Sequence, residues 1–180
     1  MSDKFDVAIV GGSIAGCTAA TFFARQGLRV ALLERNADPN AYKKVCTHYI
    51  QPCALPTLQR LRLAERIEAA GGVRNGVELW TRWGWIRFGL DERFPPHGYN
   101  IRREKLDPML RTMAAETPGV TFLPGHAVTK VHSDRQRRRA SVKLPRARCG
   151  LDIHSRPIGS ICSINTASTR TYRLRTSRGR

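Results

Sequence analysis

The sequence predicts an α/β fold on three observations. Short apolar runs of strand type at residues 6–10 and 29–34 enclose a glycine-rich turn and a segment with helical spacing of small and apolar residues. Glycine and proline punctuate a further alternation of helix-like and strand-like segments up to about residue 131. Hydrophobic residues make up 41% of the 180 residues, so the chain can build a core, and its length suits one domain.

The first 34 residues predict a strand, a turn, a helix and a second strand. The strand Asp6–Val10 runs into the turn Gly11–Gly16, and the helical segment Cys17–Gly27 ends on a glycine suited to a helix stop. The second strand, Arg29–Glu34, ends on an acidic residue. This βαβ arrangement is the unit that holds the ADP half of a dinucleotide, so the sequence predicts a Rossmann-like nucleotide-binding domain.

Each position of the glycine-rich turn has a physical role. Gly11 permits a tight turn, and Gly16 lets the helix approach the sheet closely. The helix N-terminus offers free N–H groups and roughly +0.5 of partial charge to a diphosphate. The strict pattern G-x-G-x-x-G has glycine where this chain has Ser13, whose hydroxyl is expected to bind the diphosphate or to cap the helix. A glycine-rich turn in another kind of α/β protein is the alternative.

Glu34 is expected to accept hydrogen bonds from the ribose hydroxyls. A carboxylate at this place would repel a 2′-phosphate, so the bound dinucleotide is predicted not to be NADP. The candidate cofactor-binding residues of this unit are Gly11, Gly12, Ser13, Ile14, Ala15, Gly16 and Glu34.

The phrase VAIVGGSIAGCTAA, followed by GLRVALLER, resembles the N-terminus of FAD-dependent monooxygenases of the aromatic-hydroxylase type. The related geranylgeranyl reductases and flavin halogenases share it. The resemblance implies FAD as the cofactor and NAD(P)H as a co-substrate without a glycine-rich motif of its own. It implies an oxidoreductase that uses NAD(P)H and dioxygen on a small organic substrate. A flavin-dependent prenyl reductase of the geranylgeranyl type is the alternative, favoured slightly by the stretch Lys44-Val-Cys46.

Residues 43–71 resemble the family's flavin-side loop and the helix that follows it. Pro56 suits a first helical turn and Gly71 a helix stop, so one helix is expected between them. Its core-facing stripe is predicted to be Leu58, Leu61 and Ile67. Three basic residues are expected near the adenosine and phosphates, unless they belong to a solvated loop: Arg35, Lys43 and Lys44. Cys46 resembles a position of the reductase branch, although a bystander thiol is the simpler interpretation.

The segment Tyr99–Leu110 resembles the family's R-x-x-L-D-x-x-L motif. The resemblance implies that Arg103 opens a helix and faces the ribityl and diphosphate region of the flavin. Arg102 is the competing choice because the two are adjacent, and a surface arginine near a helix start is the alternative to both. A guanidinium suits this role because its planar fork of donors matches phosphate oxygens.

Alternating residues 76–90 predict a β-hairpin inserted into the domain. Its three tryptophans, Trp80, Trp83 and Trp85, are expected to pack in a sheet, with an aromatic pocket as the alternative. Strands are expected at 119–123 and 127–131. The resemblance covers residues 4–132. The domain is therefore expected to span residues 1–133 and to be incomplete, because the family's later Gly-Ala-Asp-Gly and Gly-Asp motifs are absent from this sequence.

The basic charge is concentrated in residues 134–180. That segment has 13 Lys and Arg against two Asp, whereas residues 1–133 have 18 Lys and Arg against 12 Asp and Glu, and the whole chain has a net charge of +17. Few large apolar side chains occur there, so the segment is expected to be mostly disordered. A shifted reading frame would explain it, and an Arg-rich arm that makes the chain a nucleic-acid-binding module is the less favoured alternative.

Other features of the composition narrow the setting. No apolar run approaches the ~20 residues of a membrane-spanning helix, and no charged-then-apolar leader precedes the first strand. The five cysteines are irregularly spaced and include no C-x-x-C pair, which predicts neither a disulfide scaffold nor a metal site. A cytoplasmic location is therefore expected.

Overall fold

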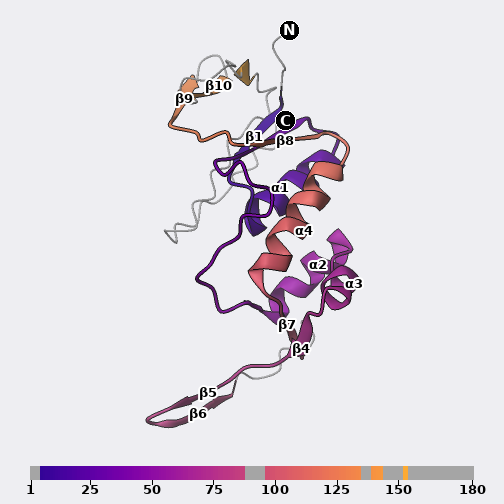
Figure 1. The fold of residues 1–180 in the computed structure, drawn as a ribbon, viewed down its shortest axis with the longest axis vertical. Coiled ribbons are helices and arrows are strands. Elements are labelled where there is room, and N and C mark those ends of the chain that lie inside the picture. The colour runs from indigo at the N-terminus through magenta and orange to yellow at the C-terminus, as the bar shows by residue number, and fades with distance from the viewer. Residues whose placement is uncertain (1–4, 88–95, 135–138, 144–151, 154–180) are drawn as a thin grey trace, which may run out of the picture.

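The structure is a computed structural model that describes residues 5–87, 96–134, 139–143 and 152–153. Figure 1 shows an elongated molecule with a parallel sheet near one end, helices in the middle and a β-hairpin at the other end. Among the described residues, no helix has the length and apolar character needed to cross a bilayer.

The predicted βαβ unit is present. It consists of β1 (Val7–Val10), α1 (Ile14–Arg25) and β2 (Val30–Glu34). The third strand, β8 (Val120–Pro124), pairs with β2, so the three parallel strands lie in the order β1-β2-β8. The α/β class is therefore confirmed, with strand ends within a residue or so of those predicted for all three strands.

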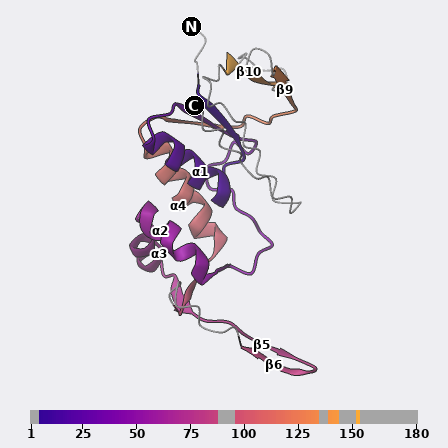
Figure 2. The ribbon, with the colours of Figure 1, turned by 180° about the vertical axis from the view of Figure 1, so that it is seen from behind.

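The two faces of this sheet bury alternate residues of each strand. Val30 and Leu32 of β2 belong to the main core with α1, whereas Ala31 and Leu33 belong to a smaller cluster on the opposite face. Helix α4 (Arg103–Glu116) packs beside α1, as Figure 2 shows from behind. This packing brings the start of α4 to the glycine-rich turn.

The prediction of a single helix between Pro56 and Gly71 is wrong, because two helices occupy this segment. A short 3₁₀ turn, η1 (Pro52–Ala54), leads into α2 (Leu55–Leu61), and a separate α3 (Ala64–Ala69) follows. The break is at Arg62, which adopts a left-handed conformation with φ of 56°. The expected stripe Leu58, Leu61 and Ile67 is buried, and the break also buries Leu63, whose N–H donates to the Leu58 carbonyl at 2.9 Å. In a straight helix Leu63 and Ile67, four residues apart, would share a face roughly opposite Leu58, so the break is what allows all of them to reach one core.

A second, antiparallel sheet lies beyond the helices. Its strands are β3 (Tyr49–Ile50), β7 (Gly98–Asn100) and β4 (Val73–Asn75), in the order β3-β7-β4. Tyr99 is buried in this sheet, and its hydroxyl donates to Glu68 Oε1 of α3 at 2.5 Å. The sheet therefore joins the helical layer to the segment that precedes α4.

The predicted hairpin is confirmed for β5 (Glu78–Thr81) and β6 (Gly84–Arg87), while residues 88–90 lie outside the described residues. The expected burial of its tryptophans in a sheet is wrong, because Trp80, Trp83 and Trp85 are 66%, 80% and 56% exposed. Trp80 and Trp85 contact each other edge to face, and the Arg82 guanidinium lies 4.1 Å from the Trp83 ring centre. Only two strands are present here among the described residues, so no second layer covers the rings.

A third, antiparallel sheet crosses the expected domain boundary. The strand expected at 127–131 begins later, as β9 (Lys130–Asp134), and pairs with β10 (Arg139–Lys143), which pairs with β11 (Asp152–Ile153). Residues 139–143 and 152–153 therefore form strands within the segment expected to be mostly disordered. The other residues of 135–180 lie outside the described residues, so the expectation for them and the boundary at residue 133 stay predictions.

Candidate cofactor-binding site

The glycine-rich turn has the backbone geometry that the sequence predicts. Gly11 has φ of +108°, a conformation that favours glycine, and its N–H donates to the Leu33 carbonyl at 2.7 Å. A Cβ atom at Gly16 would overlap the carbonyl oxygen of Gly11. The close approach of α1 to the end of β1 therefore requires a glycine at position 16.

The N-terminus of α1 is open to an anion. Ser13 is the N-cap residue and makes no side-chain cap hydrogen bond, so the expectation that it caps the helix is wrong. Its first turn contains no acidic residue, and the first amides of a helix have no intrahelical acceptor. Ile14 and Ala15 lie in this turn and are at least partly exposed. Backbone donors and the helix dipole thus favour negative charge here.

Glu34 lies at the carboxyl end of β2, directly beside the turn. Its Oε2 accepts the Gly12 N–H at 2.6 Å, and its Oε1 accepts the Asn36 N–H at 2.9 Å. A Cβ atom at Gly12 would lie only 3.1 Å from Cβ of Glu34, so the turn and the carboxylate are in close contact. Each carboxylate oxygen has a second lone pair, which leaves capacity for a ribose hydroxyl.

Arg103 reaches the same place from the start of α4. Its side chain is buried, and Nη2 donates to Ser13 Oγ at 2.8 Å while Nε donates to Asp107 Oδ1 at 2.7 Å. Nη1 of Arg103 also lies 3.7 Å from Cys46 Sγ. The backbone N–H of Arg103 donates to His48 Nδ1. Burial opposes the charged guanidinium, but the hydrogen bond and attraction of Asp107 outweigh it and raise the pKa of Arg103.

Arg102 and Arg103 occupy different environments. The Arg102 side chain is 76% exposed and pairs with Glu104 at 3.5 Å. The structure therefore brings Arg103, and not Arg102, to the glycine-rich turn.

Two residues of this site were not named as candidate binding residues, although Asp107 is the aspartate of the R-x-x-L-D-x-x-L motif. Asp107 is 1% exposed and accepts the Lys43 N–H at 3.1 Å through Oδ2, in addition to its bond with Arg103. Arg111 is 6% exposed and donates from Nε to the Gly12 carbonyl at 2.8 Å. Arg103, Asp107 and Arg111 are spaced by four residues, which places them on one face of α4. That spacing is the sequence signal that could have identified all three.

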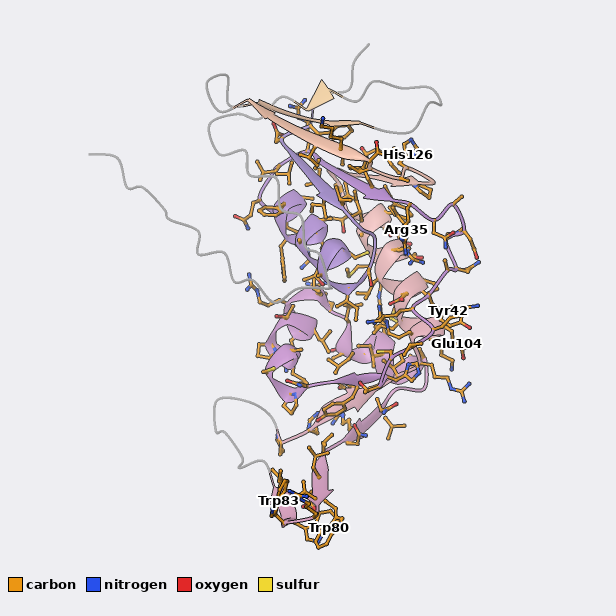
Figure 3. The ribbon with its side chains drawn as sticks, turned by 90° about the vertical axis from the view of Figure 1, so that its left-hand side faces the viewer. Arg35, Tyr42, Trp80, Trp83, Glu104 and His126 are labelled. Carbon is orange, nitrogen blue, oxygen red and sulfur yellow. The ribbon has the colours of Figure 1, made fainter. Side chains whose placement is uncertain are left out.

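The other basic candidates lie on an exposed loop between β2 and β3. Arg35, Lys43 and Lys44 are exposed, and Lys43 contributes its backbone N–H to Asp107. Figure 3 shows Arg35, Tyr42 and Glu104 along one side of the molecule. The exposure of Arg35, Lys43 and Lys44 agrees with the solvated-loop alternative, although these three residues lie on the segment that follows Glu34.

Two cysteines differ sharply in environment. Burial raises the pKa of Cys17, on α1, to about 12. The pKa of Cys46 is lowered, mainly because the His48 N–H donates to its sulfur and secondarily because Arg103 does. Cys46 thus lies beside the Arg103 guanidinium, which also contacts Ser13. Among the described residues, no cluster of three His, Cys, Asp or Glu could hold a metal ion.

Comparison with known proteins agrees with this geometry. The FAD binding domain family matches residues 4–156. The chain belongs to this family. The resemblance found in the sequence is therefore confirmed, and FAD is the cofactor of the family. The open N-terminus of α1, the carboxylate at the end of β2 and the buried Arg103 all fit the ADP half of FAD.

Relatives with three chemistries share this part of the fold. Menaquinone reductase of Mycobacterium tuberculosis is 30% identical over 148 residues, which cover 80% of this chain and 35% of the relative. Kynurenine 3-monooxygenase of Caenorhabditis briggsae is 31% identical over 140 residues, which cover 72% of this chain and 29% of the relative. The solved structure of a myxobacterial chondrochloren halogenase has a TM-score of 0.67 at 25% identity, over 85% of this chain and 36% of that one. The chain thus spans about a third of these relatives.

Proposed function

We propose that this chain is the FAD-binding part of a monooxygenase-like oxidoreductase that uses NAD(P)H and dioxygen on a small organic substrate. The observation that supports this most directly is the meeting of three groups at one turn. They are the N-terminus of α1, the Arg103 guanidinium at Ser13 and the Glu34 carboxylate at Gly12. The relationship to kynurenine 3-monooxygenase supports the monooxygenase type.

The residues of the site would divide the binding of FAD between them. The backbone of residues 11–16 and the N-terminus of α1 receive the diphosphate, and Arg103 donates to its oxygens. Glu34 accepts from the ribose hydroxyls. Arg35, Lys44 and Arg102 are exposed and add attraction over a longer range. When bound, FAD would supply the chemistry of accepting a hydride from NAD(P)H and of reacting with dioxygen.

A flavin-dependent reductase of prenyl chains is the second candidate. The position of Cys46 favours it, because this residue of the Lys-Val-Cys stretch lies next to Arg103 at the cofactor site. The relationship to menaquinone reductase supports the same class. A cytoplasmic setting is proposed for either function, since the described cysteines Cys17, Cys46 and Cys53 are all free thiols.

FAD binding is tested by titrating the purified chain with FAD, while flavin fluorescence and the midpoint of thermal unfolding are followed. We expect FAD to raise the midpoint, with about 2.7 kcal/mol of stabilisation at a hundredfold excess over Kd. FMN lacks the AMP moiety, and with it the diphosphate and the adenosine, so it is the matched control, which should leave the midpoint unchanged. If FAD and FMN behave alike, the proposed site does not bind the dinucleotide.

The role of Glu34 is tested by competition against FAD. ADP-ribose should displace FAD, whereas ADP-ribose carrying a 2′-phosphate should compete poorly because of repulsion by the carboxylate. Glu34→Gln removes the negative charge, so the two competitors should displace FAD at more similar concentrations. Equal competition in the unmodified chain would contradict the assignment of Glu34 to the ribose.

Oxidoreductase chemistry is tested on the FAD-loaded chain under anaerobic conditions. NADH or NADPH should bleach the flavin absorbance, and admission of air should restore it. An FAD-loaded chain that neither nucleotide bleaches would contradict the oxidoreductase assignment while leaving FAD binding intact.

A further inference from the structure

Arg111 makes an unusual set of contacts for a buried cation. Besides the Gly12 carbonyl, it donates from Nη1 to the carbonyls of Pro39, at 2.8 Å, and Ala41. All three acceptors are neutral backbone groups. Within the part of the chain that the structure describes, no ion pair joins Arg111 to a carboxylate. Buried charges in proteins are usually paired with an opposite charge, whereas this guanidinium is held by backbone carbonyls whose positions it fixes in turn.

The charges along the buried face of α4 do not cancel. Arg103 and Asp107 form a close ion pair at 2.7 Å, and Arg111 adds a second guanidinium on the same face. Two cations and one carboxylate leave one positive charge on this face, and the Glu34 carboxylate, which accepts the Gly12 N–H, lies at the same turn. Arg111 and Glu34 therefore hold the two polar backbone groups of Gly12 with opposite charges.

Arg111 also orients the peptide group between Gly12 and Ser13. Because a trans peptide is planar, its C=O and N–H point in opposite directions. The Gly12 carbonyl is held towards Arg111, so the Ser13 N–H points away from this guanidinium. The preceding peptide is held by Glu34, which accepts the Gly12 N–H. The two peptides of the turn are therefore each held by a charged side chain before any ligand arrives.

We propose that Arg111 is a positioning residue that orients the glycine-rich turn for the diphosphate of a nucleotide. The inference rests on the proposed function, because it concerns the same cofactor site. Arg111 holds the glycine-rich turn to the loop at residues 39–41, which follows β2. A rigid binding site loses less conformational entropy on binding, which strengthens the diphosphate interaction in particular.

The experiment compares ADP with adenosine, which share the same base and ribose but differ in the diphosphate. Arg111→Gln keeps a neutral donor and removes the charge, and Arg111→Lys keeps the charge without the planar fork. Arg66→Gln, on the exposed face of α3, is the matched control for loss of one positive charge. The Kd values of both ligands and the thermal midpoint without ligand are measured for each protein.

We expect Arg111→Gln to weaken ADP binding ~10-fold or more while adenosine binding changes less than about twofold. Arg111→Lys should fall between Arg111→Gln and the unmodified chain, and Arg66→Gln should match the unmodified chain. If both ligands weaken equally, or if ADP binding is unchanged in a folded variant, Arg111 serves stability alone and the proposal is overturned. If the unmodified chain binds neither ADP nor FAD, the proposed function fails, which is a distinct result. If Arg111→Gln does not fold, the ratio of the ADP Kd to the adenosine Kd is measured for Arg111→Lys instead. A ratio equal to that of the unmodified chain would then overturn the proposal.

Discussion

The cofactor site and the hairpin β5–β6 invert the usual relation between polarity and burial. At the cofactor site, Arg103, Asp107 and Arg111 are charged and buried, and each has hydrogen-bond partners. On the hairpin, apolar side chains are exposed on both faces, with Trp80 opposite Trp85 on one and Leu79 opposite Ile86 on the other. A two-stranded hairpin of this kind is marginal in water by itself. The described residues therefore supply hydrogen-bond partners for the buried charges of the cofactor site, whereas they leave the apolar side chains of the hairpin without a covering surface.

The largest effect is expected when the buried ion pair is broken. Asp107→Ala leaves the Arg103 guanidinium buried without a carboxylate and removes the acceptor of the Lys43 N–H. We expect the free energy of unfolding to fall by about 3–5 kcal/mol in urea denaturation. Glu104→Ala breaks the exposed pair with Arg102 on the same helix and should cost less than about 1 kcal/mol. Equal losses for the two variants would show that burial does not distinguish the two pairs.

A slightly smaller loss is expected when the turn is forced apart from α1. Gly16→Ala places a methyl group on the Gly11 carbonyl, which is backbone and not a movable side chain. The expected cost is about 3 kcal/mol, with a matching loss of FAD binding. Gly76→Ala is the control, because a Cβ at Gly76 meets no atom within 4 Å. A stable Gly16→Ala protein with normal FAD binding would argue against the close approach.

The buried thiol of Cys17 predicts an alkaline loss of stability. Its pKa rises from 9.0 to about 12 on folding, so between these values the unfolded chain releases a proton that the folded chain retains. The contribution is fully present below pH 9 and declines by about 1.4 kcal/mol per pH unit as the pH rises towards 12. Denaturation curves of Cys17→Ala should lack this slope, whereas those of Cys53→Ala should keep it, since Cys53 is exposed. An identical pH dependence in both variants would contradict the assignment.

The smallest effect on stability is expected at the hairpin. Replacing Trp80 and Trp85 with serine removes an exposed pair of rings whose centres lie 5.2 Å apart. The free energy of unfolding, measured by thermal denaturation, should change by less than about 1 kcal/mol. Trp83→Ser alone is the comparison, because that ring stacks with Arg82 at the tip. A large loss of stability in the double variant would mean that the rings are packed against the body of the protein.

The sequence predicted those parts of the fold that depend on local pattern. Strands β1 and β2 are continuous apolar runs, and Gly11 and Gly16 have roles that follow from their spacing alone. Arg103 was predicted through a family motif, but the choice between it and Arg102 needed the structure, because only the direction of α4 separates adjacent residues.

Long-range contacts explain what the sequence did not predict. Arg111 meets Gly12 across 99 residues, and no local pattern reports such a contact. The break at Arg62 follows from the burial of Leu63 against a core assembled from distant segments. The strand at 139–143 depends on pairing with β9, which residue composition does not measure.

The regular spacing along α4 has a consequence for how this protein tolerates changes in length. Arg103 and Arg111 are separated by eight residues, a rise of about 12 Å, and both contact the same turn of the chain. One residue inserted between them would rotate Arg111 by roughly 100° about the helix axis and move its guanidinium away from Gly12. We therefore expect a one-residue insertion or deletion between these two arginines to break the contact of Arg111 with Gly12. A change in length at the end of the helix, at Glu116, would leave both contacts in place.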